Sequence, residues 1–304
     1  MQILRTPEER FLNLPDYAFT PNYTDVPADS GTAEQLRVHY VDEGSGRSGE
    51  TVLLMHGEPS WSYLYRHMIP LLTREGHRCV APDLVGFGRS DKPAARADHT
   101  YQRHIDWMRG LLFDRLDLHD VTLVCQDWGG LIGLRLVAEH PERFARVVVA
   151  NTGLPTGDAV PTRAFLEWRE FSQAAEDFSA SDVVALGCRT PSAAALAPYD
   201  APYPDDSFKA GARQFPMLVP VRHDDPASEP NRRAWKALES FDKPFLCAFS
   251  DRDPITAGGD QVFRQRVPGC RGQDHLTVEG AGHFLQEDRG PELARIVNRF
   301  LAST

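Results

Sequence analysis

One stretch of thirteen residues, VTLVCQDWGGLIG at positions 121–133, constrains the fold more than any other part of the chain. It opens with a nearly continuous apolar run, which is typical of a strand buried on both faces of a parallel sheet. Behind two glycines, the apolar residues resume at helical spacing. A strand is therefore expected to end at about Gln126 and a helix to begin at about Trp128, which leaves Asp127 on a sharp corner between them.

Apolar runs of the same kind alternate with helix-like stretches along much of the chain. The strand-like runs lie at 36–44, 51–57, 77–84, 121–127, 146–153, 244–253 and 275–283, and helical spacing is found at 100–118 and 130–144. Apolar strands separated by helices predict a largely parallel sheet covered by helices on both faces. The first two runs, joined by GSGRSGE at 44–50, are expected to form an antiparallel hairpin at the edge of the sheet.

The alternation stops between about Asn151 and Lys243. The sequence there is rich in Pro and Ala and contains helix-compatible stretches but no convincing strand. Strand-like sequence then returns, which favours an insertion into one sheet over a second independent domain. We therefore expect a helical cap domain at 153–242, inserted into a core domain formed by 1–152 and 243–304.

The composition argues against several classes of partner. The chain has 33 Lys and Arg against 43 Asp and Glu, a formal net charge of -10, and it has no dense basic run, so it would repel nucleic acid. The N-terminal segment carries charges where a signal peptide has its apolar core, and no stretch reaches the apolar length of a membrane span. We expect a cytoplasmic protein that binds neither nucleic acid nor membranes. Its five well-separated cysteines are expected to be reduced thiols.

Residues of catalytic type follow three of the predicted strands. Asp127 occupies the serine position of the G-x-S-x-G strand-turn-helix corner, although Cys125 stands where that motif has its first glycine. Taken alone, Asp127 is equally well explained as the N-cap of the following helix. Asp253 follows a later strand and His283 follows the next one. Nucleophile, acid and histidine occur in this order at successive strand ends of α/β-hydrolases.

On these motifs the chain resembles the α/β-hydrolase superfamily and, within it, the haloalkane dehalogenases of the branch that has HGE after the second strand. The similarity extends over nearly the whole chain from Leu4 onward, and the pair Asp127-Trp128 is its most specific element. The segments that carry it are HGEPSWSYLYR (56–66), APDLVGFGRSDKP (81–93), VCQDWGG (124–130), YDAPYPDDSFKAGARQFP (199–216), DRDP (251–254) and GAGHFLQED (280–288). The resemblance implies an α/β-hydrolase fold, in which a mostly parallel eight-stranded sheet is flanked by helices and carries an inserted helical cap.

The resemblance also implies a reaction, the hydrolytic dehalogenation of haloalkanes through a covalent alkyl-aspartate intermediate. Asp127 is expected to displace the halide and form an ester. His283, oriented by Asp253, is then expected to deprotonate the water that hydrolyses this ester. Asp251 is the alternative acid, but Asp253 is preferred because Pro254 follows it, as in the family motif.

Further roles are implied for groups around the reacting carboxylate. The backbone N–H groups of Glu58 and Trp128 are expected to form an oxyanion hole, and the indoles of Trp128 and Trp168 to bind the halide. A tryptophan in an amphipathic helix is more often a core residue, so the role of Trp168 rests on its family position. The expected pocket residues are Phe165, Phe215, Pro216 and Phe284, whereas Trp61, Trp107 and Trp235 are assigned to the core or surface.

The expected steps require no metal, nucleotide or organic cofactor. GFGRSD lacks the spacing of a dinucleotide-binding loop, and the histidines at 99, 104 and 223 lack a set of accompanying zinc ligands. The expected partners are a small halogenated alkane and the halide product, with the chain as a monomer or weak homo-oligomer.

Other functions use related residues. An epoxide hydrolase would use the same Asp-His-Asp set with cap tyrosines, for which Tyr199 and Tyr203 are candidates. A fluoroacetate dehalogenase would have Arg rather than Trp128 after the nucleophile, and a non-enzymatic binding protein would lack part of the set. The residue after Asp127 and the cap tryptophan favour dehalogenation of haloalkanes.

Overall fold

The computed structural model describes residues 1–29, 31–45, 47, 49–189 and 191–304. Its main element is an eight-stranded sheet with the strand order β10-β9-β8-β7-β4-β5-β3-β2, as the sequence predicts for the fold class. The strands of this sheet are β2 (Asn22–Pro27), β3 (Gln35–Glu43), β4 (Thr51–Met55), β5 (Arg78–Pro82), β7 (Val121–Gln126), β8 (Phe144–Ala150), β9 (Phe245–Ser250) and β10 (Leu276–Val278). The short strands β1 (Ile3–Leu4) and β6 (Lys92–Pro93) pair separately.

The central strands are parallel and buried on both faces. All six residues of β7 are buried, and β7 pairs in parallel with β4 on one side and β8 on the other. Their near-continuous apolar sequence suits this position, because helices cover both faces of a parallel sheet. Among the described strands of this sheet, only β3 runs against the others. It is antiparallel to both β2 and β5, so β2 runs in the same direction as the central strands.

The prediction that 36–44 and 51–57 form an antiparallel hairpin is wrong. The two segments form β3 and β4, but β5 lies between them in the sheet, and the antiparallel edge pair is β2 with β3. The connection at 44–50 therefore crosses over one strand position; its residues 46 and 48 lie outside the described part of the chain. Alternating apolar residues show which face of a strand is buried, but they do not identify its neighbour.

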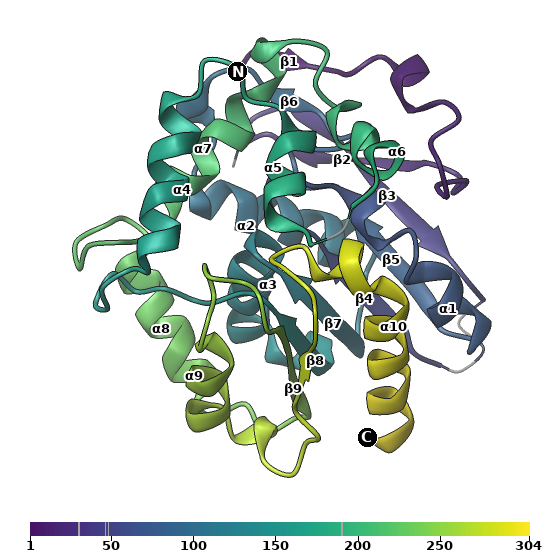
Figure 1. Cartoon of the computed structure of the whole chain (residues 1–304), viewed down its shortest axis with the longest axis vertical. Coiled ribbons are helices and arrows are strands. Elements are labelled where there is room, and N and C mark those ends of the chain that lie inside the picture. Colours follow the sequence, from purple (N-terminus) through teal and green to yellow (C-terminus); the bar gives the residue numbers. More distant parts are fainter. Residues whose placement is uncertain (30, 46, 48, 190) are drawn as a thin grey trace.

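Helices lie against the faces of the sheet and beyond the ends of its strands. They are α1 (Ile69–Arg74), α2 (Tyr101–Arg109), α3 (Trp128–Glu139), α4 (Arg163–Ala174), α5 (Ala180–Gly187), α6 (Ala193–Leu196), α7 (Ala210–Leu218), α8 (Ser228–Leu238), α9 (Gly259–Arg266) and α10 (Leu285–Ser303). Helix α1 packs against α10, and α3 packs against both α2 and α8. Figure 1 shows α1 and α10 on one side of the strands and α8 and α9 on the other.

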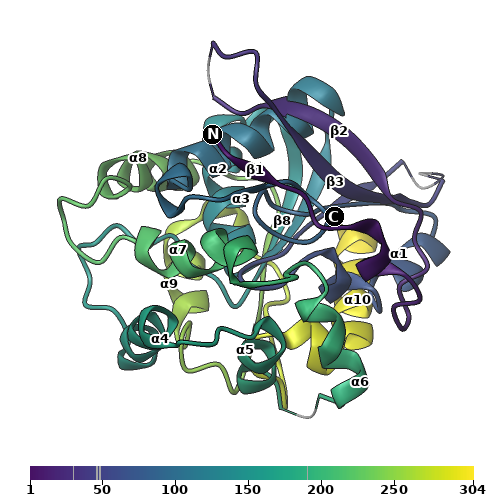
Figure 2. The same ribbon diagram turned by 90° about the horizontal axis from the view of Figure 1, so that it is seen from above.

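The segment between β8 and β9 contains helices α4 to α8 and no strand among its described residues, as its sequence predicts. Figure 1 shows α4, α5 and α7 grouped beyond the ends of β7 and β8. Figure 2 shows β2 and β3 on the side of the molecule away from α4 and α5. None of the helices in the described residues has both the length and the apolar composition needed to cross a membrane.

Candidate active site

The corner at Asp127 lies where the sequence predicts it. Strand β7 ends at Gln126 and helix α3 begins at Trp128. Asp127 has φ 50° and ψ -128°, a backbone conformation that residues other than glycine rarely adopt. Its N–H donates to the carbonyl of Asn151 at 3.1 Å, and its carbonyl accepts a hydrogen bond from the Thr152 hydroxyl at 2.7 Å. The end of β8 therefore holds the strained residue on both sides.

The two glycines after Trp128 allow the helix to start close to the sheet. A Cβ atom on Gly129 would overlap the backbone carbonyl of Met55, and one on Gly130 would overlap the side chain of Thr152. Any larger residue at either position would push α3 away from β4 or β8 and move the corner with it.

His283 and Asp253 are brought together from the loops after β10 and β9. The Nδ1 atom of His283 lies 3.0 Å from the Oδ2 atom of Asp253. The carboxylate also accepts hydrogen bonds from the backbone N–H of Ile255 at 2.9 Å and from the hydroxyl of Thr256. Burial opposes ionisation of Asp253, but His283 and these donors outweigh it and lower the pKa of Asp253 to about 2. Asp251 lies elsewhere and accepts from the N–H of Gly280 at 2.7 Å.

His283 also faces Asp127. Its Nε2 atom lies 3.6 Å from the Oδ2 atom of Asp127, and the imidazole is almost completely buried. Burial disfavours the imidazolium, but the two carboxylates, Asp253 and Asp127, outweigh it and raise the pKa of His283 to about 10. The resting site therefore favours the protonated form of His283.

Glu58 contributes its backbone to this site and keeps its carboxyl buried beside it. Its N–H donates to the Oδ1 atom of Asp127 at 2.8 Å. Burial and, secondarily, the charge of Asp127 raise the pKa of the Glu58 carboxyl well above its ordinary value. The N–H of Trp128 belongs to the first turn of α3, where backbone amides have no partner within the helix.

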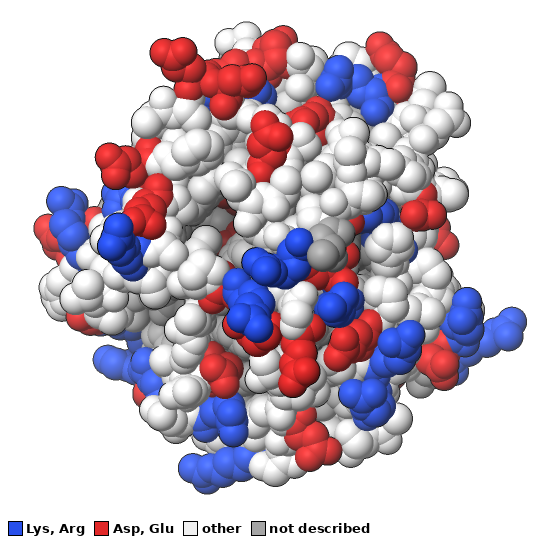
Figure 3. Space-filling model, viewed as in Figure 1, with Lys and Arg blue, Asp and Glu red and all other residues white. Residues whose placement is uncertain are grey.

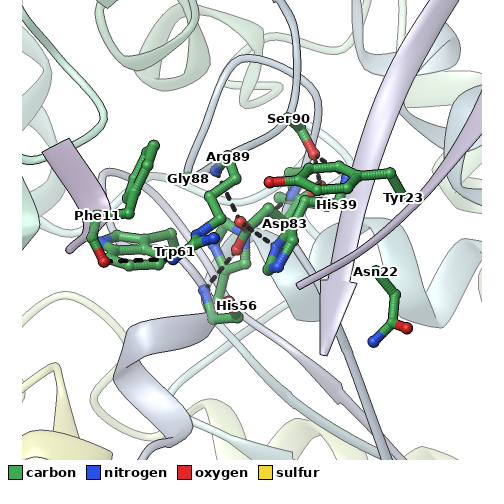
Figure 4. Close-up of polar contacts among 12 residues, drawn as sticks. Phe11, Asn22, Tyr23, His39, His56, Trp61, Asp83, Gly88, Arg89 and Ser90 are labelled. Carbon is green, nitrogen blue, oxygen red and sulfur yellow. Dashed lines mark hydrogen bonds and ion pairs between the residues drawn. The ribbon is translucent and has the colours of Figure 1, made fainter. Parts of the chain in front are cut away.

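A buried carboxylate supports the loop that carries Glu58. Asp83 accepts hydrogen bonds from the N–H groups of Ser62 and Arg89, each at 2.8 Å, and lies 2.7 Å from Nδ1 of His39. Figure 4 shows Asp83 at the centre of these contacts, next to His56 at the start of the loop. Burial opposes ionisation, but the contacts with His39 and the donors around it lower the pKa of Asp83 well below its ordinary value. The loop is thus fixed by a charge that is itself fully satisfied.

A cavity of about 560 Å³ opens above the corner, and Asp127, Asp253 and His283 line it. Figure 3 shows a hollow near the middle of this face, bordered largely by uncharged side chains with Lys or Arg side chains beside it. Of the expected pocket and halide-binding residues, five line the cavity: Trp128, Phe165, Trp168, Pro216 and Phe284.

The expectation for Phe215 is wrong, because it does not line the cavity. Its ring is fully buried and packs behind Trp128, with the ring centroids 4.5 Å apart. Successive helix residues point about 100° apart, so α7 directs Pro216 to the cavity and Phe215 to the core. Phe215 supports the indole of Trp128.

The five tryptophans differ in what their indole N–H groups contact. Three donate to backbone carbonyl groups: Trp61 to Pro198 at 3.2 Å, Trp107 to Ala28 at 3.0 Å and Trp235 to Leu154 at 2.7 Å. Within the described residues, the N–H groups of Trp128 and Trp168 have no hydrogen-bond acceptor. Both of these tryptophans line the cavity, so each can donate to a bound group.

Sequence reasoning missed three polar residues that hold the histidine and its acid. The amide of Asn151 donates to the carbonyl of His283 at 3.0 Å, the hydroxyl of Thr256 donates to Asp253, and the amide nitrogen of Gln126 lies 3.0 Å from Nε2 of His283. Asn151 and Gln126 are polar residues that directly end an apolar strand run. This position in the sequence is the signal that could have identified them. In the described part of the chain, no group of three or more His, Cys, Asp or Glu side chains is arranged to hold a metal ion.

The cap tyrosines do not reach this cavity. The hydroxyl of Tyr199 donates to Glu287 at 2.7 Å, and that of Tyr203 donates to the carbonyl of Pro59 at 3.4 Å. Neither residue is among those that line the cavity. Their hydroxyl groups join the segment between β8 and β9 to the rest of the protein.

Comparison with known proteins agrees with the geometry of the site. Residues 50–290 match the α/β hydrolase fold family. The haloalkane dehalogenase of Psychrobacter cryohalolentis is 57% identical over 302 residues, which cover 99% of this chain and 98% of that protein. The haloalkane dehalogenase of Mycolicibacterium paratuberculosis is 51% identical, with 97% of this chain and 96% of that protein covered.

Solved structures include a similar protein. The tetrameric haloalkane dehalogenase DpaA of Paraglaciecola agarilytica superposes with a TM-score of 0.90 at 37% identity, and 97% of each chain is covered. Identities of this size over nearly the full length, together with the fold, show that the chain belongs to the haloalkane dehalogenase family.

Proposed function

We propose that this protein hydrolyses haloalkanes to an alcohol, a halide ion and a proton, through an ester formed on Asp127. The observation that carries the proposal is the pair Asp127-Trp128, because it places a carboxylate beside an indole N–H that has no acceptor among the described residues. The family membership of the chain supports the same reaction. Haloalkanes are the substrate class, and halide is the first product.

In the first step, an oxygen of Asp127 attacks the carbon that carries the halogen. The carbon–halogen bond breaks with its electron pair, so that halide leaves and an alkyl ester remains on Asp127. The indoles of Trp128 and Trp168 donate to the departing halide, and each hydrogen bond to a charged group contributes about 1.5–3 kcal/mol. This stabilisation grows as charge develops on the halogen and therefore accelerates the step.

In the second step, His283 deprotonates a water molecule that attacks the ester carbonyl. Esterification converts the carboxylate of Asp127 into a neutral group, which removes one of the two charges that raise the pKa of His283. The remaining carboxylate, Asp253, orients the imidazole at 3.0 Å and stabilises the imidazolium that forms. The first step thus prepares the base for the second.

The oxyanion formed during ester hydrolysis needs donors that are in place beforehand. The N–H of Glu58 already donates to Oδ1 of Asp127 at 2.8 Å in the resting site, and the N–H of Trp128 follows directly on the corner. Loss of one such donor typically costs about 3–4 kcal/mol of transition-state stabilisation. Asp83 contributes indirectly, because it fixes the loop that carries the N–H of Glu58.

Epoxide hydrolysis is the alternative reaction for an Asp-His-Asp set. It needs hydroxyl donors at the epoxide oxygen, but Tyr199 and Tyr203 are engaged elsewhere and do not line the cavity. The indoles of Trp128 and Trp168 suit a halide instead. We therefore favour dehalogenation.

Halide release from a panel of bromoalkanes, with one epoxide of similar size as a competitor substrate, tests the proposal. We expect stoichiometric bromide and alcohol from the bromoalkanes and no diol from the epoxide. Diol formation without bromide release would reverse the assignment. An Asp127→Asn variant serves as the control for spontaneous hydrolysis.

Several further features are part of the proposal. We propose a core domain formed by 1–152 and 243–304, a cap domain at 153–242, and a cytoplasmic location. Its partners are a small halogenated alkane and halide rather than nucleic acid or membrane. We propose a monomer or weak homo-oligomer, although the related DpaA is described as tetrameric. Size-exclusion chromatography with light scattering distinguishes a monomer or weak homo-oligomer from a stable tetramer.

A further inference from the structure

Gln126 contacts His283, the proposed catalytic base, through its side-chain nitrogen atom. It is the last residue of β7 and is fully buried. Its Nε2 atom lies 3.0 Å from Nε2 of His283 and donates to the backbone carbonyl of the same histidine at 3.2 Å. Its Oε1 atom has no hydrogen-bond partner among the described residues. A buried glutamine that leaves its acceptor unused is held by its donor contacts.

The backbone carbonyl of His283 determines which way this amide faces. If the amide were turned over, its oxygen would lie against that carbonyl oxygen, and two acceptors would face each other. The amide nitrogen, which can only donate, therefore points to the imidazole. An imidazole nitrogen that accepts a hydrogen bond carries no proton, so the proton of neutral His283 is on Nδ1, facing Asp253 at 3.0 Å.

We propose that Gln126 is a positioning residue, whose amide holds neutral His283 in the tautomer with a bare Nε2 atom. This inference rests on the proposed role of His283 as the base. A water molecule can give its proton only to Nε2, because Nδ1 is occupied by Asp253. The amide N–H occupies the same lone pair until a water molecule displaces it.

The same contact opposes protonation of Nε2. In the imidazolium, the Nε2–H group would point at the amide N–H from 3.0 Å, so two donors would face each other. Three carboxyl groups lie around the ring. Asp253 and Asp127 favour the imidazolium. The carboxyl of Glu58, after β4, is also close, because the charge of His283 partly offsets the rise that burial causes in the pKa of Glu58. Gln126 offsets part of the attraction of the two aspartates.

The tautomer can be observed without turnover, at pH values above the protonation midpoint of His283, where the neutral imidazole is populated. Long-range proton–nitrogen NMR of protein labelled with ¹⁵N-histidine separates the two ring nitrogens, and a His283→Gln variant assigns the signal. We expect the neutral form of His283 to carry its proton on Nδ1. A proton on Nε2 of the neutral form in the wild-type protein would overturn the proposal directly, whatever the substrate of the enzyme is.

Gln126→Met keeps the approximate volume of the side chain and removes the donor. We expect the protonation midpoint of His283 in the NMR titration to move to higher pH. In single-turnover experiments near neutral pH, hydrolysis of the alkyl-enzyme should slow about tenfold, a fraction of what a general base contributes, while formation of the alkyl-enzyme stays within about twofold. An unchanged midpoint with unchanged hydrolysis would refute the positioning role.

Gln286 provides a matched control. It is also buried, donates to the hydroxyl of Tyr65 at 3.4 Å, and also has an Oε1 atom without a partner in the described chain. Gln286→Met should therefore lower stability without moving the His283 midpoint. An equal shift in both variants would mean that the effect is one of packing and would contradict the proposal. If no alkyl-enzyme forms in any protein, the proposed function fails, whereas the NMR result still decides the tautomer.

Discussion

His283 lies with its Nε2 atom 3.6 Å from Oδ2 of Asp127, so the proposed base of the second step faces the proposed nucleophile of the first. The two groups attract each other only while Asp127 is ionised, and ester formation ends this attraction. The order of the two steps therefore has an electrostatic basis. Each step can be blocked separately.

Replacement of His283 by Gln should stop the reaction after the first step. Ester hydrolysis should slow by about 100-fold or more, because a general base typically contributes 10²–10⁴ in rate. Mass spectrometry after incubation with a bromoalkane should find the alkyl group on the peptide that contains Asp127. An adduct on the neighbouring Cys125 instead would show that the nucleophile is wrongly assigned.

Turnover in ¹⁸O-labelled water should place solvent oxygen in the carboxylate of Asp127. Water that attacks the ester carbonyl leaves its oxygen on the aspartate, and the alcohol takes the oxygen that attacked the substrate. Peptide mass spectrometry after one turnover measures the label. If only the alcohol is labelled, water attacks the substrate directly and no ester is formed.

Added bromide or iodide should change tryptophan fluorescence in a saturable way. Trp128→Phe and Trp168→Phe should each remove most of this response and slow the first step, because each loses one donor worth about 1.5–3 kcal/mol. Trp235→Phe is the control, since its indole already donates to the carbonyl of Leu154. Normal halide binding and alkylation in Trp168→Phe would mean that another cap residue holds the ion.

Asp83→Asn should destabilise the protein by about 3–5 kcal/mol at neutral pH, because it breaks a buried pair with His39. The pKa of Asp83 is lower in the folded protein than in the unfolded chain. Its stabilisation is therefore present above the unfolded pKa of about 4 and is lost as pH falls towards the folded value. Urea unfolding across this acid range should show a weaker pH dependence in the variant than in the wild type. Equal slopes would assign the acid sensitivity to other carboxylates.

The sequence predicts the corner and the acid–base pair because their signals are local. Two glycines after an apolar strand require a close approach of helix and sheet, and this places Asp127 correctly. Asp253 and His283 each follow a strand of the same sheet, so strand order along the chain suffices to bring them together. The choice of Asp253 over Asp251 came from the family motif, and the structure places Asp253 against His283.

Other features depend on contacts between distant segments and have no local signal. The pairing of β3 with β5 rather than β4 follows from how the whole sheet is arranged. Phe215 and Pro216 are adjacent in the sequence, but only the rotation of α7 decides which of them faces the cavity. Gln126 resembles an ordinary strand terminus until the loop after β10 places His283 against it.

The absence of room at Gly129 and Gly130 also limits how this enzyme can be altered. In a saturation library, almost every substitution at these two positions should abolish expression of folded protein, and second-site changes cannot easily compensate, because the obstacles include the backbone of Met55 and the packed side chain of Thr152. The partly exposed face of α4 carries no such restriction. Selection for new halogenated substrates should therefore accumulate changes around Phe165 and leave the corner at Asp127 untouched, so that substrate specificity evolves separately from the chemical steps.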